Sequence, residues 1–267
     1  MSVLLRIAFC ALLIVAGTQS QAVAAEQGQS GRLTAGVSFD IPGMGYKNPK
    51  TGEIEGFEPN VARAIAEKLL GAPGRVDFVQ VLDKDRIKAL QDGLVDIVVS
   101  QLTITPERAE QVDFSVPYYV TGEGLLVPTG SGIKRFEDLA GKRIAATAGS
   151  FSLQRMQASL PSLPGATLVI TPTSSATLDA VANDEADAAS NDLIDLSFLR
   201  SASNQPDQYE LIDIADSFQP KPFGVAVKKG NSALVDRLNE AIDSLKSNGD
   251  IDRLLNEAIA NVGSPSP

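Results

Sequence analysis

The chain has 267 residues, of which 43% are hydrophobic, and carries 23 Lys and Arg against 33 Asp and Glu, a formal net charge of −10. A chain of this length can fold as one or two domains with a substantial core. Because it has no His and a single Cys, the composition excludes His-dependent catalytic triads, intramolecular disulfides and Cys-rich metal clusters. The acidic balance also argues against nucleic acid or anionic lipid as a partner.

The first 25 residues have the pattern of a secretory signal peptide. A basic residue precedes an apolar run over residues 7–17, which is too short to span a bilayer comfortably. Small residues follow, so we expect cleavage near Ala24/Ala25 and release into the periplasm; an uncleaved N-terminal anchor is the alternative. Cys10 lies within the apolar run and not at its end, so we expect no lipid anchor.

After residue 31, short apolar runs typical of strands alternate with helical patterns. The predicted helix over residues 61–70, for example, places Val61, Ile65 and Leu69 on one face. Strands that alternate with helices predict an α/β fold with largely parallel sheets. In chain order, the predicted strands are 32–37, 76–81, 97–99, 124–127, 143–146, 167–170, 186–190, 209–213 and 223–227. The predicted helices are 61–70, 85–91, 106–111, 150–160, 174–181, 193–200, 232–246 and 251–259.

The most informative segment is residues 100–108, which follows a predicted strand. Thr105 is a good helix N-cap and Pro106 suits the first helical position. Arg108 stands in the first helical turn, where an exposed cation opposes the helix dipole by roughly 0.3–1 kcal/mol. An Arg beside free helix N–H groups and the Thr103 hydroxyl would bind a carboxylate, because its donors form bidentate pairs. A surface ion pair with neighbouring acidic residues is the alternative.

Two further candidate sites follow predicted strands. Gly149 permits a tight turn and Ser150 caps the next helix, an arrangement that can accept an anion at the helix start. Asp192 follows the strand over residues 186–190, at the end where ligands bind in open α/β sheets, and could accept an ammonium group. In both cases a plain helix cap is the alternative.

No residues are spaced as a nucleophile–base pair, a phosphate-binding loop or a metal-binding loop. We therefore expect no catalytic residues, no metal and no cofactor. An active site made of carboxylates alone stays open as an alternative.

Several motifs of the chain, taken together, carry a family resemblance. The most specific is Leu-Thr-Ile-Thr-Pro-Glu-Arg at residues 102–108, followed by Val-Asp-Phe-Ser-Val-Pro-Tyr-Tyr at residues 112–119. With these motifs the chain resembles the family 3 solute-binding proteins that serve amino-acid ABC importers. The resemblance covers residues 32–260, and its other motifs lie at residues 56–66, 87–96, 139–145 and 223–230.

The resemblance implies the two-lobed periplasmic binding protein fold (type II), in which two parallel-rich sheets are joined by two crossing strands. Lobe 1 would comprise residues 32–121 and 222–267, and lobe 2 residues 122–221. The hinges would lie at residues 120–122 and 219–222, and the lobes would close around a ligand. The protein would be a monomer in this reading.

The resemblance also implies a role for each candidate residue. Arg108 would grip the α-carboxylate of an amino acid, helped by Thr103 and by Ser150 and Phe151. Asp192 would take the α-ammonium from the other lobe. Phe151 stands where the family commonly has Thr, so it offers only a backbone N–H and an apolar ring.

The ligand's side chain is predicted from residues 39–46 and 83–86, which are similar to the glutamate-binding branch of the family. Arg86 would bind a side-chain carboxylate, which gives a preference for glutamate or aspartate. The alternative is that Arg86 pairs with a neighbouring aspartate. Gln101, which replaces a small residue common at its position, completes the predicted site.

These inferences predict a periplasmic substrate-binding protein of an ABC importer, with an amino acid as ligand and a membrane permease as partner. Two other functions fit the same resemblance. One is an exported enzyme similar to the cyclohexadienyl dehydratases, and the other is a free sensor that presents its ligand to a receptor.

Overall fold

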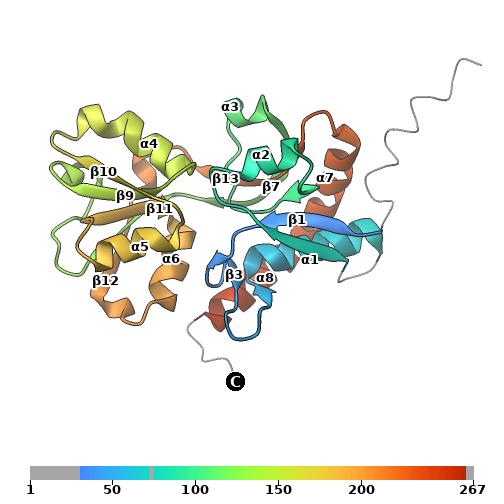
Figure 1. Cartoon of the computed structure of the whole chain (residues 1–267), viewed down its shortest axis with the longest axis horizontal. Helices are drawn as coiled ribbons and strands as arrows, with labels where there is room; N and C mark the ends of the chain where they lie inside the picture. The colour runs from blue at the N-terminus through green and yellow to red at the C-terminus, as the bar shows by residue number, and fades with distance from the viewer. Residues whose placement is uncertain (1–30, 72–74, 263–267) are drawn as a thin grey trace, which may run out of the picture.

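The computed structural model describes residues 31–71 and 75–262. The predicted signal peptide and its cleavage site lie outside the described residues. The chain forms two lobes that lie side by side and are connected by long strands (Figure 1). Each lobe is built around a five-stranded sheet against which helices pack, so the predicted α/β fold is confirmed.

The sheet of lobe 1 has the strand order β5-β1-β6-β13-β7. Strand β1 pairs in parallel with β5 and β6, whereas β13 pairs antiparallel with β6 and β7. The bounds are Leu33–Val37 for β1, Val76–Gln80 for β5, Ile97–Val98 for β6, Val112–Thr121 for β7 and Lys221–Lys228 for β13. A small antiparallel sheet is added by β2 (Asp40–Ile41), β3 (Gly45–Lys47) and β4 (Ile54–Glu55).

The sheet of lobe 2 has the order β10-β9-β11-β8-β12. Strand β9 pairs in parallel with β10 and β11, and β8 pairs antiparallel with β11 and β12. The bounds are Glu123–Pro128 for β8, Arg143–Thr147 for β9, Thr167–Thr171 for β10, Ala188–Asp192 for β11 and Tyr209–Asp213 for β12.

The parallel character expected from the sequence is thus confined to three neighbouring strands of each sheet. The antiparallel strands lie where the chain passes between the lobes, from β7 to β8 and from β12 to β13. No helical crossover of the kind that links parallel neighbours stands at either passage.

The helices begin and end close to where their periodicity predicts. They are α1 Phe57–Leu70, α2 Arg86–Gln91, α3 Pro106–Ala109, α4 Phe151–Ser159, α5 Ser175–Ala182, α6 Leu193–Ala202, α7 Ser232–Ser247 and α8 Asp250–Asn261. Helix α1 begins four residues before its prediction, because Pro59 is tolerated in a first helical turn. The sequence pattern does not predict β7, because Asp113 and Pro117 interrupt its apolar run.

Aromatic side chains pack the two crossing strands, β7 and β13, together with α1 of lobe 1. The ring of Phe57, at the start of α1, lies 6.2 Å from that of Tyr118 and 5.9 Å from that of Tyr119, both on β7. Tyr118 and Tyr119 also pack against Phe223 of β13. The two crossing strands therefore share a hydrophobic core with α1, where apolar burial provides most of the stabilisation.

We propose to divide the chain as the sequence predicts, with residues 32–121 and 222–267 in lobe 1 and residues 122–221 in lobe 2. Strands β7 and β13 pair from Lys228 and Val112 to Lys221 and Thr121. The pairing ends where β8 enters the other sheet, which supports hinges at residues 120–122 and 219–222.

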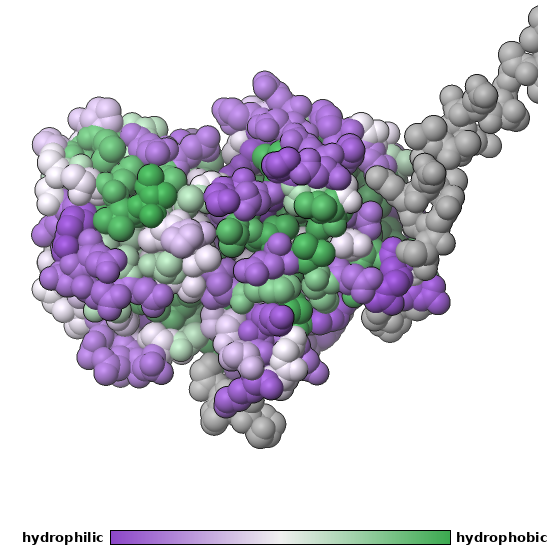
Figure 2. Space-filling model, in the orientation of Figure 1, coloured by the Kyte–Doolittle hydropathy of each residue, from purple (hydrophilic) through white to green (hydrophobic). Residues whose placement is uncertain are grey.

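Figure 2 shows polar side chains over most of one face of the molecule, with apolar patches on both lobes. Within residues 31–71 and 75–262, no helix has both the length and the apolar character that a membrane crossing requires. Over the same ranges, no group of three or more Cys, Asp or Glu side chains is arranged to hold a metal ion.

Candidate ligand-binding site

Arg108 lies at the start of α3 with its side chain turned inward. Thr105 caps the helix by accepting a hydrogen bond from the Arg108 N–H at 3.3 Å. The guanidinium donates from Nη1 to the Thr103 carbonyl at 3.0 Å and from Nη2 to the Gly149 carbonyl at 3.1 Å. The side chain is buried, so the alternative of a solvated surface ion pair does not describe it. Arg108 instead reaches from lobe 1 to lobe 2.

Gly149 brings the two lobes into contact. Its φ is +83°, and a Cβ at this position would lie 2.4 Å from the Cα of Lys84 in lobe 1. Only glycine avoids both the backbone strain and this overlap. The carbonyl of Gly149 is therefore presented to lobe 1 at close range, and the described lobes are closed on each other.

Helix α4 begins two residues after Gly149, with Ser150 as its N-cap. The Ser150 hydroxyl accepts a hydrogen bond from the Leu153 N–H at 3.0 Å, so the predicted cap is confirmed. Phe151 is the first helical residue, and its ring centroid lies 6.0 Å from the Arg108 guanidinium carbon and 4.8 Å from that of Arg155. The first N–H groups of a helix have no acceptor within the helix, so α4 offers donors beside Arg108.

Arg86 is more deeply buried than Arg108, with 1% of its surface exposed. Its guanidinium donates to the carbonyls of Asp83 at 3.0 Å and Ser100 at 2.5 Å, and Nη2 lies 3.2 Å from the Asp83 carboxylate. The alternative pairing with a neighbouring aspartate is therefore present. Nη2 also makes a longer hydrogen bond of 3.4 Å to the Gly149 carbonyl.

Two guanidinium groups thus converge on a single carbonyl oxygen across the lobe interface. Burial, and then the neighbouring charge of Arg86, lower the pKa of Arg108 to about 10. Burial also raises the pKa of the Asp83 carboxyl although Arg86 lies beside it, which weakens Asp83 as a counter-ion. An anion bound between the two guanidinium groups would relieve their mutual repulsion.

Asp192 ends β11 and stands at the N-cap position of α6, but its side chain makes no capping hydrogen bond. Its Oδ1 lies 3.0 Å from the Nζ of Lys221, the first residue of β13. The alternative role of a plain helix cap is therefore not what the structure shows. Asp192 is 6% exposed, so its carboxylate is a largely dehydrated acceptor at the lobe interface.

Gln101 has an unusual backbone, with a φ of +41°. Its N–H donates to Glu58 at 2.7 Å, and its side-chain amide donates to Glu58 and to the Ser38 hydroxyl, at 3.3 Å in the latter case. Its amide donors are thus used inside lobe 1. The structure therefore places Gln101 beside Ser100 and Thr103 but directs its amide group to Glu58.

Several polar atoms in this region are buried without a hydrogen-bond partner, which is costly unless a ligand supplies one. Among the described residues, five side-chain atoms have this property. Three of them lie on Ser100, Thr103 and Asp195 of this region, and another is the Nε of Arg155. The fifth, Oδ1 of Asp192, has the ion pair with Lys221 at 3.0 Å as its contact. The predicted residues Thr103 and Arg108 are in contact, and the charge of Asp192 acts on Arg108. Of these three residues, Thr103 has the hydroxyl that lacks a partner.

Four charged residues of this region are not predicted from the motifs of the sequence, although each carries a signal. Glu58, Glu123, Asp195 and Lys221 are all buried, with no more than 1% of their surface exposed. Each interrupts or flanks an apolar run that the structure makes into a helix or strand. A charge at a core position is rare unless it is paired or functional, and this criterion would have selected them.

The protonation of the buried Glu58 carboxyl can be tested through the pH dependence of the protein's stability. Burial raises the pKa of its carboxyl to about 8, against the opposing effect of hydrogen bonds from Tyr118 and Gln101. Between its ordinary value of 4.5 and about 8, the folded protein holds a proton at Glu58 that the unfolded chain has released. The stabilisation from this proton is complete below pH 4.5 and is lost as the pH rises to about 8.

We expect Glu58→Gln to flatten the fall of the unfolding free energy between pH 4.5 and 8, measured by urea denaturation at several pH values. The exposed Glu185 supplies the matched control, since Glu185→Gln should leave the slope as it is in the wild type. An equally steep fall in the Glu58→Gln variant would contradict the assignment.

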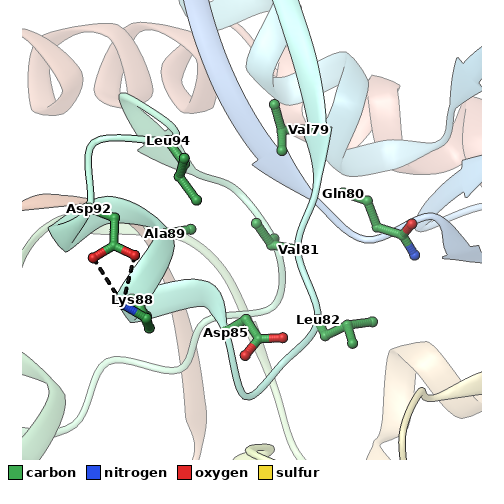
Figure 3. Close-up of a pocket in the computed structure, with 9 residues that line it drawn as sticks. All are labelled: Val79, Gln80, Val81, Leu82, Asp85, Lys88, Ala89, Asp92 and Leu94. Carbon is green, nitrogen blue, oxygen red and sulfur yellow. Dashed lines mark hydrogen bonds and ion pairs between the residues drawn. The ribbon is translucent and has the colours of Figure 1, made fainter.

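A separate hollow lies in lobe 1, beside β5 and α2 (Figure 3). It has a volume of about 430 Å³ and is lined by apolar side chains such as Val81, Ala89 and Leu94, with the Lys88–Asp92 ion pair at its rim. None of the predicted ligand-binding residues lines it. It is therefore distinct from the candidate site between the lobes.

Comparison with known proteins identifies the class. The family described as bacterial extracellular solute-binding proteins, family 3, matches residues 33–260. The chain belongs to this family, and its fold is the two-lobed type II periplasmic binding protein fold.

Individual relatives share most of their length with this chain. It is 35% identical over 224 residues to the ABC transporter glutamine-binding protein GlnH of Bacillus subtilis, covering 84% of this chain and 79% of that protein. It is 26% identical over 247 residues to the glutamate-binding protein GluB of Corynebacterium efficiens, covering 89% and 81%. A structure of an ancestral arginine-binding protein bound to arginine superposes with a TM-score of 0.75 at 31% identity, covering 85% and 97%.

Proposed function

We propose that this protein binds an α-amino acid between its two lobes and delivers it to the membrane permease of an ABC importer. The observation that carries the proposal is the meeting of Arg108 from lobe 1 with the Gly149 carbonyl and the start of α4 from lobe 2. Asp192 lies on the same lobe as Gly149, as a buried carboxylate. Cationic and anionic groups so arranged suit the two charged ends of an amino acid. The relatives named for glutamine, glutamate and arginine support this class of ligand.

In this proposal Arg108 holds the α-carboxylate, together with the Thr103 hydroxyl and the Phe151 N–H at the start of α4. Ser150 contributes as the cap of that helix, because its own N–H donates to the Thr147 carbonyl at 3.0 Å. The Thr103 hydroxyl is buried and without a partner, and a carboxylate oxygen would satisfy it. Asp192 accepts the α-ammonium from lobe 2. Ligand contacts from both lobes favour closure about the hinges.

We further propose an acidic ligand, glutamate or aspartate. The support is the second guanidinium, because Arg86 lies beside Arg108 and both point at the same carbonyl oxygen. A protein with a formal net charge of −10 does not attract anions at long range. Recognition of an acidic side chain therefore needs such a local cation.

Titration calorimetry with a panel of acidic, amide, basic and aliphatic amino acids tests the proposal. We expect glutamate or aspartate to bind at least tenfold more tightly than glutamine or asparagine, about 1.4 kcal/mol. Arg86→Ala should abolish this difference while weak binding of neutral amino acids continues through Arg108 and Asp192. Lys84→Ala removes an exposed cation two residues away and should keep the difference.

Tightest binding of glutamine, of a basic amino acid or of an aliphatic one would refute the acidic preference but not the amino-acid site. The absence of any amino-acid binding would refute the site itself. Conversion of a cyclic dienyl acid to a product would favour a dehydratase over a transport protein.

A further inference from the structure

A buried cluster of charges surrounds the carboxylate of Asp192. Lys221 lies 3.0 Å from Asp192 and 2.7 Å from Glu123, and its Nζ donates to the Ser152 hydroxyl at 2.7 Å. Lys221 and Glu123 are no more than 1% exposed. An ammonium group has three N–H donors, and in this cluster each has an acceptor. Lys221 is therefore a fixed cation beside the acceptor proposed for the ligand's ammonium.

Glu123 is surrounded by donors. Its Oε1 accepts from the Ser190 hydroxyl at 2.7 Å, and its Oε2 accepts from the Ser152 hydroxyl at 3.2 Å and faces Lys221. Burial raises the pKa of the Glu123 carboxyl, and the positive charge of Lys221 opposes that effect. Because one of these donors is the Lys221 ammonium group, the pattern suits the ionised carboxylate.

Lys221 is held in its charged form. Burial lowers the pKa of its ammonium group, but Asp192 and Glu123 together outweigh burial, so that this pKa is raised above its ordinary value. Asp195 lies one helical turn beyond Asp192, and burial followed by the Asp192 charge raises its pKa well above the usual range. Asp195 therefore favours its neutral form and adds little to the charge of the cluster.

The charged groups within hydrogen-bond distance of Lys221 do not balance among themselves, although the Arg108 guanidinium of lobe 1 also acts on Asp192. Two carboxylates, Glu123 and Asp192, face one resident cation, Lys221. One further positive charge makes the buried cluster neutral, and the α-ammonium of an amino acid supplies it. Buried charges are tolerated when they are paired, so the imbalance favours a ligand that carries an ammonium group.

We infer that Glu123 and Lys221 are positioning residues for amino-acid recognition: Glu123 neutralises Lys221 and thereby leaves the charge of Asp192 available to the ligand's ammonium. This inference rests on the proposed function. Neither residue needs to touch the ligand. Both act by setting how much of the Asp192 charge the ligand meets.

The inference predicts opposite effects for a single and a double variant. Glu123→Gln leaves Lys221 paired with Asp192 alone, so the ligand's ammonium becomes a surplus cation. We expect L-glutamate binding to weaken at least tenfold. In Glu123→Gln/Lys221→Met, Asp192 has no resident cation, and binding should return to within threefold of the wild type or become tighter. This rescue distinguishes a charge effect from damage to the fold.

The experiment is titration calorimetry on the wild type and on both variants, with glutarate as the analogue of glutamate that lacks the ammonium group. Glutarate binding should change less than threefold in each variant. L-glutamine and its analogue without the ammonium group, glutaramic acid, serve as a second pair of probes. Glu210→Gln is the matched control, because it neutralises another lysine-paired carboxylate of lobe 2, on the strand beside β8 at the level of Val127, four residues beyond Glu123.

Binding of L-glutamate or L-glutamine by Glu123→Gln within threefold of the wild type would overturn the inference. So would a folded double variant that binds them tenfold more weakly than the wild type, a result that stands even if the single variant does not fold. Failure of the wild type to bind any amino acid would instead remove the proposed function, and this inference with it.

Discussion

Arg108→Ala should weaken amino-acid binding by about 2–5 kcal/mol, the usual cost of removing one partner from a buried, hydrogen-bonded charge pair. Arg108 is 9% exposed, and its guanidinium is the group that joins the Thr103 carbonyl of lobe 1 to the Gly149 carbonyl of lobe 2. Without it, the α-carboxylate keeps only neutral donors from Thr103 and the start of α4. Charge-assisted bonds are roughly twice as strong as neutral ones, so those donors do not compensate.

The measurement is titration calorimetry with the amino acid that the wild type binds most tightly, and circular dichroism to verify the fold. Arg135→Ala supplies a matched control, because Arg135 lies on the surface of lobe 2 with 73% of its side chain exposed. An affinity of Arg108→Ala within about threefold of the wild type would rule out the proposed role of Arg108.

Asp192→Asn should give weak binding and a protein that stays open when ligand is added. The substitution keeps the shape of the side chain and one acceptor oxygen, but it removes the charge proposed to hold the ammonium. Because Asp192 belongs to lobe 2 and Arg108 to lobe 1, a ligand bound by both draws the lobes together. A ligand held by lobe 1 alone provides no free energy for closure.

Small-angle scattering with and without ligand measures closure, and calorimetry measures affinity. Asp184→Asn is the control in the same lobe, since the side chain of Asp184 is 92% exposed and pairs with Arg143 at the surface. Ligand-induced compaction of Asp192→Asn together with unchanged affinity would show that Asp192 does not hold the ammonium.

Local pattern in the sequence was sufficient for most of the secondary structure. The predicted helix at residues 232–246 differs from α7 by one residue, because Leu238, Ile242 and Leu245 repeat at helical spacing on a buried face. Strand β7 has no such pattern. Its buried residues Val112, Ser115 and Tyr118 recur at every third position, and its pairing with β13 contains register shifts, so the alternation typical of a strand is missing.

The same distinction holds for the site. Thr105, Pro106 and Arg108 could be interpreted from the sequence, because a helix start has its own chemistry and an arginine there is out of place. The α/β class follows from the alternation of strands and helices. These features depend on residues a few positions apart, so local sequence patterns are sufficient to predict them.

Which charges share a buried site depends on the folded arrangement of the strands. Lys221 meets Glu123 and Asp192 because β13 pairs with β7 at the point where β8 begins, while β11 lies beside β8 in the other sheet. Arg86 and Arg108 likewise meet at Gly149, 63 and 41 residues away along the chain. Strand order and lobe closure create these contacts, and the energy of a charge depends on its burial and its partners. Neither the burial of a charged group nor the identity of its partners follows from the position of its residue in the sequence.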